Sequence, residues 1–162
     1  MPVINKLTAL EILDSRGRPT VQTTCQLQSG ATATASVPSG ASTGAAEARE
    51  LRDGDPRRYR GLGCRRAVAH VNRDLNNALA GQPFAQQKEL DQTLLALDGT
   101  PDKSRLGANA LLSVSLAFAR AAAHEGEVPL YNYFANMVGQ RPRLPRLTIN
   151  LFSGGKHAGG QV

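Results

Sequence analysis

Residues 38–44, which read PSGASTG, bring together residue types able to bind a small ligand. Glycine and proline disfavour the interior of a helix or strand, and serine and threonine compete for backbone hydrogen bonds, so this stretch is predicted to be a loop. Its amides could close over a small anion, and the hydroxyl oxygens of Ser42 and Thr43 could coordinate a hard cation. The alternative interpretation is an ordinary glycine- and serine-rich connection on the surface.

A second glycine-rich stretch, SGGKHAGG, carries Lys156 and His157. It follows a short apolar run, residues 147–152, that is typical of a fully buried strand. Before that run the sequence reads RPRLPR, whose two prolines exclude a helix and favour an extended basic linker. Because a buried strand needs neighbouring strands, we expect two domains. Residues 1–140 would form the first, and residues 141–162 would be the linker and the first strand and loop of a second, incomplete one.

The elements that must position these stretches can be predicted from hydrophobic periodicity. Residues 3–37 have the pattern of three strands, of which the clearest alternates between a polar face and an apolar face made of Val21, Thr23, Cys25 and Leu27. The repeat of this alternation predicts an antiparallel meander with one face exposed to water. The period then lengthens to that of a helix, which predicts helices over residues 64–79, 90–97 and 108–122 and a shorter one that begins at Leu130. The predicted fold class is therefore α+β.

The composition is that of a globular protein with a sizeable core. Hydrophobic residues make up 41% of the 162 residues and charged residues 20%, and no apolar run is long enough to span a bilayer. The N-terminal residues lack the features of a secretory signal, and Glu11 and Asp14 argue against a transit peptide, so a cytoplasmic location is expected. Cys25 and Cys64 have no metal-like spacing and are predicted to be packed thiols rather than a disulfide or a nucleophile.

The net charge of +6 and the pI near 9.9 leave nucleic acid or another anion as a conceivable partner. Much of the excess comes from five clustered arginines, which are Arg57, Arg58, Arg60, Arg65 and Arg66. Tyr59 is the single aromatic residue among them, and the sequence has neither a zinc-finger spacing nor an RNA-recognition signature. The cluster is therefore interpreted as a solvated or interface face, and nucleic acid is not expected as a partner.

Several further features have sufficient structural explanations. The motif DSRGRP contains turn residues, although a turn does not require Arg16, for which a buried or interfacial ion pair is the functional alternative. Residues 98–110 contain turn signals and a plausible N-cap at Ser104, which predicts a loop between helices. His70 and His124 lie on or near predicted helices without a second ligand four residues away, which favours structural or surface roles.

In sequence order, the stretches DSRGRPT, VPSGASTG, EARELRDGD, LDGTPDKSRLGANA and SGGKHAGG resemble the enolase family, the phosphopyruvate hydratases. Five motifs in this order are far more specific than one glycine-rich loop. The resemblance covers essentially the whole chain. It implies the α+β capping domain found at the N-terminus of enolases, a three-stranded meander followed by helices, together with the start of a truncated α/β barrel.

The resemblance also implies roles for individual residues. Ser42 matches the serine that binds the second, catalytic magnesium ion when the loop closes over the substrate, and Gly40, Ala41 and Thr43 match the rest of that lid. His157 matches a histidine that approaches the substrate in the closed site. The chemistry suits these roles, because a hydroxyl in a mobile loop can add one hard oxygen ligand and a histidine can donate a hydrogen bond to a phosphate or leaving hydroxyl. Mg²⁺ is the implied cofactor.

The implied reaction is the glycolytic dehydration of 2-phosphoglycerate to phosphoenolpyruvate. Proton abstraction next to a carboxylate forms a dianionic intermediate, so metal ions are needed to hold the charge, as is known for enolase-superfamily sites. The family carries its acid and base, a glutamate and a lysine, on later barrel strands that would lie beyond Val162. The 162 residues alone are therefore expected to be inactive. The sequence departs from the family at Ser153, usually asparagine, and at Arg146, usually an apolar position.

An alternative function is a non-catalytic interaction or dimerisation module. Enolases associate through surfaces that include this domain, so the resemblance implies a homo-oligomer. A strand after Arg146 without a partner would leave an exposed edge that could pair with another chain. A membrane is not an expected partner.

Overall fold

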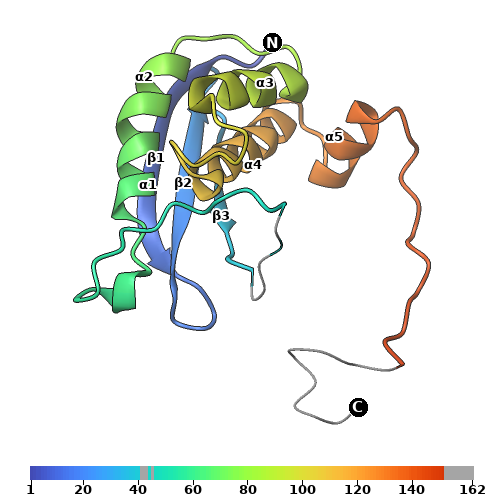
Figure 1. Cartoon of the computed structure of the whole chain (residues 1–162). Helices are drawn as coiled ribbons and strands as arrows, with labels where there is room; N and C mark the ends of the chain where they lie inside the picture. The colour runs from blue at the N-terminus through green and yellow to red at the C-terminus, as the bar shows by residue number, and fades with distance from the viewer. Residues whose placement is uncertain (41–43, 45, 152–162) are drawn as a thin grey trace.

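The structure is a computed structural model that describes residues 1–40, 44 and 46–151. It combines one antiparallel sheet with helices packed against one of its faces (Figure 1). The strands are β1 (Ile4–Leu13), β2 (Pro19–Leu27) and β3 (Thr32–Val37). The helical elements are a 3₁₀ turn η1 (Tyr59–Gly61), α1 (Arg65–His70), a π-helical turn η2 (Val71–Leu75), α2 (Asn76–Leu79), α3 (Gln87–Asp98), α4 (Ala108–Glu125) and α5 (Leu130–Met137). Within the described residues no helix is both long and apolar enough to cross a membrane.

The sheet is the predicted meander, with the strand order β1-β2-β3. Its register places Cys25 of β2 between Leu7 of β1 and Ala33 of β3. The predicted alternation is confirmed, because Val21, Thr23, Cys25 and Leu27 are all buried against the helices. The opposite face carries polar side chains such as Thr24 and Thr34, whose hydroxyl oxygens lie 3.0 Å apart. The α+β class and the meander followed by helices are therefore observed.

Helix α4 forms the centre of the core by packing across β2 and β3. Its sheet-facing positions are mostly small, including Ala110, Ala117 and Ala121, which are fully buried. Small side chains allow the helix backbone to approach the sheet closely. One polar contact is buried in this interface, between the hydroxyl oxygens of Thr23 and Ser113 at 2.7 Å. The predicted alanine-rich helix is thus confirmed as the main cover of the sheet.

Both cysteines are free and buried in this core. Burial raises the pKa of the Cys25 thiol to about 12 and also raises the pKa of the Cys64 thiol. A thiol that stays protonated is a poor nucleophile and a poor metal ligand. The prediction of packed thiols is confirmed.

The outer edge of β1 is covered by asparagine side chains from the continuous helical segment α1-η2-α2. Asn72 accepts a hydrogen bond from the Ala9 amide (2.7 Å) and donates one to the Ala9 carbonyl oxygen (3.1 Å). Asn76 accepts one from the Leu7 amide (2.8 Å). An uncovered edge strand would offer these groups to other chains. The two amides therefore occupy the place that a fourth strand would take.

A charged pair secures the far end of the same strand. Arg58 binds the Glu11 carboxylate with both terminal nitrogens, one of them 2.9 Å from Oε2, and the Cys64 amide donates to Oε2 at 2.5 Å. The hydrogen bond from Arg58 lowers the pKa of Glu11, against the effect of burial, which would raise it. Arg58 is thus a structural residue, and the prediction that the whole arginine cluster forms a solvated face is wrong for this member.

The structure differs from two further sequence expectations. Helix α4 is preceded by Gly107 and not by Ser104 as the N-cap. Gly107 has a φ of 98°, and a Cβ atom there would lie 2.5 Å from the Cβ atom of Leu51, so the close packing of residue 51 requires glycine. The predicted loop at residues 98–110 is shorter in the structure, because Asp98 ends α3 and α4 begins at Ala108, so the loop is residues 99–107.

The second difference concerns the apolar run after the basic linker. Its described part, residues 147–151, forms no strand, and Leu147, Ile149 and Leu151 are 95%, 83% and 76% exposed. The described sheet consists of β1-β2-β3, which lies elsewhere, so this run has no adjacent strand against which to bury its side chains. The expected buried strand is therefore not formed here. The division of the chain at residue 140 stays a prediction.

Replacing Asn72 by alanine tests the covered edge. The Asn72→Ala variant should lose about 1–2 kcal/mol of unfolding free energy, because both polar groups of Ala9 lose their partner. Urea denaturation measures this loss. Asn77→Ala is the matched control on the same helical segment, since Asn77 is exposed, and its stability should stay within about 0.5 kcal/mol of the parent. Equal losses in both variants would contradict the edge-covering role.

The pair of Glu11 with Arg58 predicts a pH-dependent stability. Because the folded state lowers the Glu11 pKa, the stabilisation is complete above the usual value of 4.5 and is lost as the pH falls through the folded value. Glu11→Gln should therefore be less stable than the parent by about 1–3 kcal/mol at pH 7, and the difference should shrink at about pH 3. Denaturation at both pH values tests this. Glu127→Gln, an exposed position, should show no such convergence.

Candidate functional site

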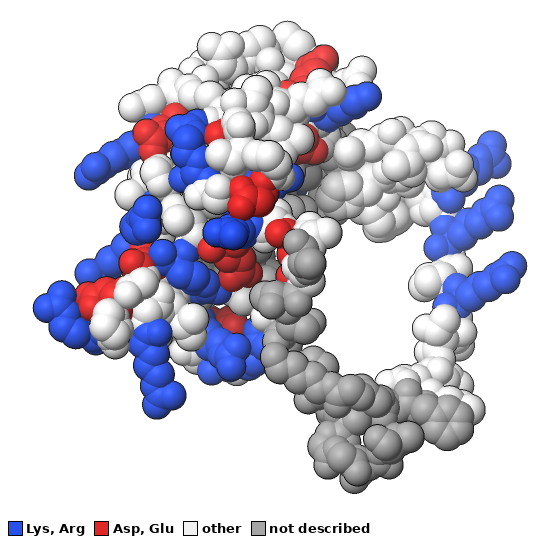
Figure 2. All heavy atoms as spheres, viewed as in Figure 1, with Lys and Arg blue, Asp and Glu red and all other residues white. Residues whose placement is uncertain are grey.

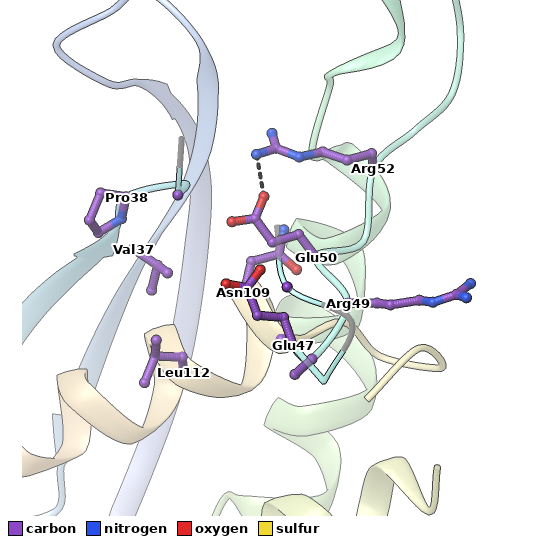
Figure 3. Close-up of a pocket in the computed structure, with 12 residues that line it drawn as sticks. Val37, Pro38, Glu47, Arg49, Glu50, Arg52, Asn109 and Leu112 are labelled. Atoms are coloured by element: carbon purple, nitrogen blue, oxygen red, sulfur yellow. Dashed lines mark hydrogen bonds and ion pairs between the residues drawn. The ribbon is translucent and has the colours of Figure 1, made fainter. Parts of the chain in front are cut away.

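A cavity of about 650 Å³ lies beside the stem of the loop at residues 38–44 (Figure 3). Three segments meet around it, namely the end of β3, residues 47–52 and the first turns of α4. Its described lining consists of Val37, Pro38, Gly40, Gly44, Glu47, Ala48, Arg49, Glu50, Arg52, Ala108, Asn109 and Leu112. The loop predicted to be a lid thus leaves the sheet at the rim of a hollow, the position that a lid requires.

The structure places one of the five predicted site residues. Gly40 lines the cavity. Ala41, Ser42, Thr43 and His157 lie outside the described residues. The predicted roles of these four residues stay predictions, and the site must be analysed from the segments that hold the loop.

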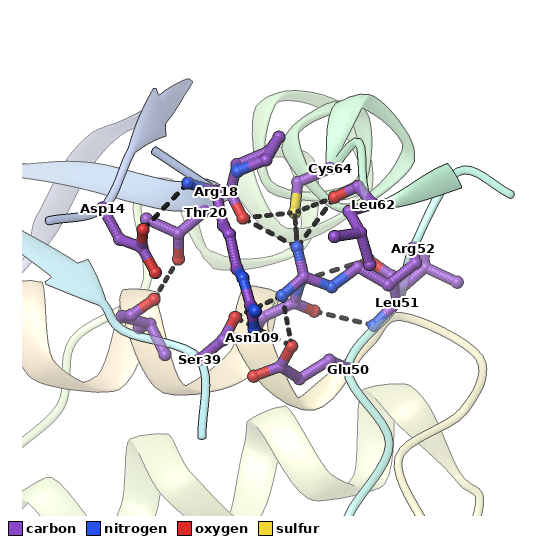
Figure 4. A network of polar contacts seen from close by, with 12 residues as sticks. Asp14, Arg18, Thr20, Ser39, Glu50, Leu51, Arg52, Leu62, Cys64 and Asn109 are labelled. Atoms are coloured by element: carbon purple, nitrogen blue, oxygen red, sulfur yellow. Dashed lines mark hydrogen bonds and ion pairs between the residues drawn. The ribbon is translucent and has the colours of Figure 1, made fainter. Parts of the chain in front are cut away.

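The guanidinium group of Arg52 holds these segments together (Figure 4). Its Nη2 atom donates to Glu50 Oε2 at 2.5 Å and to the hydroxyl of Ser39 in the loop stem. Its Nη1 atom donates to three acceptors, which are the carbonyl oxygens of Pro19 (2.7 Å) and Leu62 (2.8 Å) and the Sγ atom of Cys64 (3.0 Å). One side chain therefore joins the start of β2, the stem of the lid and the segment before α1.

The stem of the loop is held from a second side by the β1–β2 turn. The Arg16 guanidinium donates to the carbonyl oxygen of Ser39 at 2.6 Å and also contacts Asp14 at 3.4 Å. The amides of Arg18 and Arg16, together with the Arg16 charge, lower the pKa of Asp14. The Thr20 hydroxyl donates to the carbonyl oxygen of Val37. The ion pair considered for Arg16 exists on the surface, and its guanidinium also contacts the lid stem.

The other wall of the cavity is held by the start of α4. Asn109 accepts a hydrogen bond from the Leu51 amide (3.0 Å) and donates one to its carbonyl oxygen (3.1 Å). The Ala108 amide donates to the Arg49 carbonyl oxygen at 2.8 Å. This pairing fixes residues 49–51 in the way that a neighbouring strand would. Asn109 is nevertheless a side chain on a helix, so its partner could not be identified from sequence periodicity.

The charges around the cavity are mixed. Glu50 and Arg52 face each other and neutralise one another, while Arg49 points away from the cavity and pairs with Asp102 at 3.1 Å (Figure 3). Glu47 is exposed on the rim and makes no ion pair with any described residue. Most charged groups in the described lining are therefore paired, and the Glu47 carboxylate is the exception.

The oxygen atoms around the cavity could bind a metal ion only in addition to ligands that come from elsewhere. The described residues contain no group of three His, Cys, Asp or Glu side chains that could hold a metal ion. The Glu50 carboxylate is already bound by Arg52 and Ser39, so Glu47 is the remaining carboxylate of the described lining. The site is therefore compatible with adding one or two hard oxygen ligands to an ion that is held mainly by other groups.

Sequence reasoning missed Arg52 and Asn109 as members of this site. Arg52 lies in the motif EARELRDGD and Asn109 in LDGTPDKSRLGANA, and no rule of turn or helix chemistry explains an arginine or an asparagine there. An unexplained polar residue inside such a motif is the available signal. Its partners follow only from the contact between the two motifs in the fold.

Replacing Arg52 by lysine tests its joining role. Lysine keeps the charge but cannot reach acceptors in several directions at once, so Arg52→Lys should lose about 2 kcal/mol of stability. The amides of Val37, Ser39 and Gly40 should also exchange with solvent faster, which hydrogen-exchange mass spectrometry measures. Arg49→Lys is the control, because the Arg49 side chain is 75% exposed and its change should be near zero. Unchanged exchange in Arg52→Lys would overturn the assignment.

Comparison with known families agrees with the geometry. A family model described as the N-terminal domain of enolase matches residues 4–134. The match runs from the start of β1 into α5 and includes the loop stem, Arg52 and Asn109. It covers most of the chain, and the observed meander followed by helices is the fold expected for that domain. The chain therefore belongs to the enolase family, in which it represents the N-terminal domain.

Proposed function

We propose that this domain supplies the lid of an enolase-type active site, in which 2-phosphoglycerate is dehydrated to phosphoenolpyruvate with the help of Mg²⁺. The observation that carries the proposal is the rigid stem of residues 37–39 at the rim of the cavity. A stem held by Arg16 and Arg52 confines any movement to the residues that follow. Lid closure of this kind excludes water and completes a catalytic site.

In this proposal Ser42 adds one oxygen ligand to the second magnesium ion when the lid closes. Bound magnesium would stabilise the negative charge that develops when a proton is removed next to the substrate carboxylate. Gly40, Ala41 and Thr43 would close over the substrate, and His157 would donate a hydrogen bond to its phosphate or leaving hydroxyl. The acid and base would come from the barrel domain of the family, and the reaction would belong to cytoplasmic glycolysis.

A domain exchange tests the role of Ser42. An active enolase whose own N-terminal domain is replaced by residues 1–140 of this chain should convert 2-phosphoglycerate to phosphoenolpyruvate. Ser42→Ala in this chimera should lower kcat roughly 100-fold or more, the size typical of losing one preorganised contact to developing charge. Absorbance of the product measures both rates.

Two controls make the exchange decisive. Ser29→Ala removes a hydroxyl from the β2–β3 turn and should leave kcat unchanged. The 162-residue chain alone should give no turnover with magnesium present, because a lid without an acid and a base cannot stabilise the transition state. A folded chimera in which Ser42→Ala is as active as the parent would refute the metal-ligand role, and turnover by the chain alone would refute the division of labour.

A second candidate function, self-association without catalysis, is favoured by the exposed apolar side chains of residues 147–151. Apolar and polar residues alternate in this run, and an exposed run of this kind is able to pair with another chain. Sedimentation velocity of the chain and of a version that ends at Gln140 distinguishes the two candidates. A homo-oligomer that depends on residues 141–162 would support association through this segment, and identical monomers would count against it.

A further inference from the structure

Residues 53–66, which we name the arginine loop, form a closed projection that includes the turn η1 and ends at the start of α1 (Figure 1). The two ends of the projection are joined by hydrogen bonds from the Asp53 amide to the Gly63 carbonyl oxygen (2.8 Å) and from the Gly54 amide to the Gly61 carbonyl oxygen (3.0 Å). A Cβ atom at residue 63 would lie 2.3 Å from Asp53 Oδ2, so the closure requires glycine. The loop therefore has a defined base.

The base is strengthened by charged groups that are turned inward. The Asp53 carboxylate accepts hydrogen bonds from the amides of Arg65 (3.0 Å) and Arg66 (2.9 Å) and lies 3.6 Å from Arg58. Arg58 also binds Glu11 of β1. These contacts use the backbone of residues 65 and 66 and leave their side chains free to face solvent. The loop is thus preorganised before any partner arrives.

The tip of the loop holds an uncommon backbone conformation. Tyr59, Arg60 and Gly61 follow one another with φ values of 48°, 54° and 87°. Left-handed residues other than glycine normally occur singly, because their Cβ atom crowds the backbone. Strained conformations of this kind persist where surrounding contacts impose them, and they cluster at binding sites. The exposed side chains of Arg57, Tyr59 and Arg60 lie together at this tip, while Arg58 turns inward to Glu11.

Among the described residues, four of the five arginines on this projection make no ion pair outside it. Arg57 pairs with its neighbour Asp55 at 3.1 Å and keeps a side chain that is 90% exposed, and Arg60, Arg65 and Arg66 are exposed and form no ion pair with any described residue. Arg65 and Arg66 occupy the first turn of α1, where the helix dipole disfavours positive charge, so helix stability does not explain them. Figure 2 shows basic side chains gathered at the end of the molecule where the projection lies in Figure 1.

Apolar surface lies among these charges. Tyr59 is 44% exposed and Leu62 is 39% exposed. The Arg58 guanidinium stacks 4.7 Å from the centre of the Tyr59 ring and holds it in place. Arginine and tyrosine together are typical anchors of protein interfaces, whereas binding of single-stranded nucleic acid usually relies on several aromatic side chains. The mixture therefore favours a protein partner over a nucleic acid.

We propose that the arginine loop is a docking surface for an acidic patch on another protein. Arg57, Arg60, Arg65 and Arg66 would pair with its carboxylates, and Tyr59 and Leu62 would contact apolar side chains among them. This interaction is independent of the proposed lid, because none of these side chains lines the cavity beside it.

Binding of fluorescent poly-L-glutamate to the purified chain tests the proposal. The fourfold variant Arg57→Gln, Arg60→Gln, Arg65→Gln, Arg66→Gln should bind at least about 10-fold more weakly than the parent in low salt. The matched control removes four exposed arginines elsewhere, through Arg120→Gln, Arg141→Gln, Arg143→Gln and Arg146→Gln. It should weaken binding less than about 3-fold, since no preorganised surface is lost. Equal weakening in both variants would show a general charge effect and overturn the proposal.

A single substitution separates binding from folding. Arg60→Gly relieves the left-handed strain, so its melting temperature should rise or stay unchanged while its affinity for poly-L-glutamate falls more than that of Arg120→Gln. An affinity like that of Arg120→Gln would mean that the strained tip has no binding role. Single-stranded oligothymidylate of the same charge is the competing probe. Tighter binding of this probe through the same four arginines would reject the protein partner in favour of nucleic acid.

Discussion

The arrangement around the candidate site depends on the hydrogen bonds of Arg52. This one guanidinium group donates hydrogen bonds to the carbonyl oxygens of Pro19 and Leu62, which belong to segments far apart in the sequence. Ser39 and Glu50 bind the same group from the side of the cavity. A planar fork with five N–H donors can serve acceptors in several directions, which lysine cannot. Strand, lid stem and loop are thereby fixed relative to each other.

The guanidinium group of Arg52 lies between the lid stem and the arginine loop, for which different functions are proposed. The stem of the proposed lid precedes Arg52 in the sequence, and the arginine loop follows Arg52. Both arise from the same base, because Arg52 reaches Ser39 in the stem on one side and Leu62 and Cys64 behind the loop on the other. A rigid base allows either surface to contact a ligand without disturbing the core, since the contacts are made by residues that carry little of the packing.

The sheet contributes by remaining closed to other chains along one edge. Asn72 and Asn76 bind backbone groups of Ala9 and Leu7 in β1, and Arg58 binds the Glu11 side chain further along the same strand. The helical segment that carries the asparagines includes the π-helical turn η2, a feature that often shifts side chains into register with a specific partner. The domain thus combines a sheet whose β1 edge is covered with an exposed arginine loop.

Local chemistry in the sequence determined the elements and the family. Alternation predicted the three strands and the faces of residues 21–27, and the helical period predicted the helices, because both patterns depend on which side of one element is buried. The ordered motifs identified the enolase N-terminal domain, since five motifs in one order are far more specific than any single motif. The buried cysteines followed from the same patterns.

Only the tertiary structure decided the partners of polar side chains. Arg52, Asn109 and Asn72 bind backbone groups that are distant along the chain, and no local pattern specifies such a pairing. The same limit explains the error at Arg58, whose charge resembles those of its exposed neighbours until Glu11 is brought beside it. The described residues 147–151 form no strand for a related reason, because a strand is defined by a neighbour that supplies hydrogen bonds and not by its own sequence.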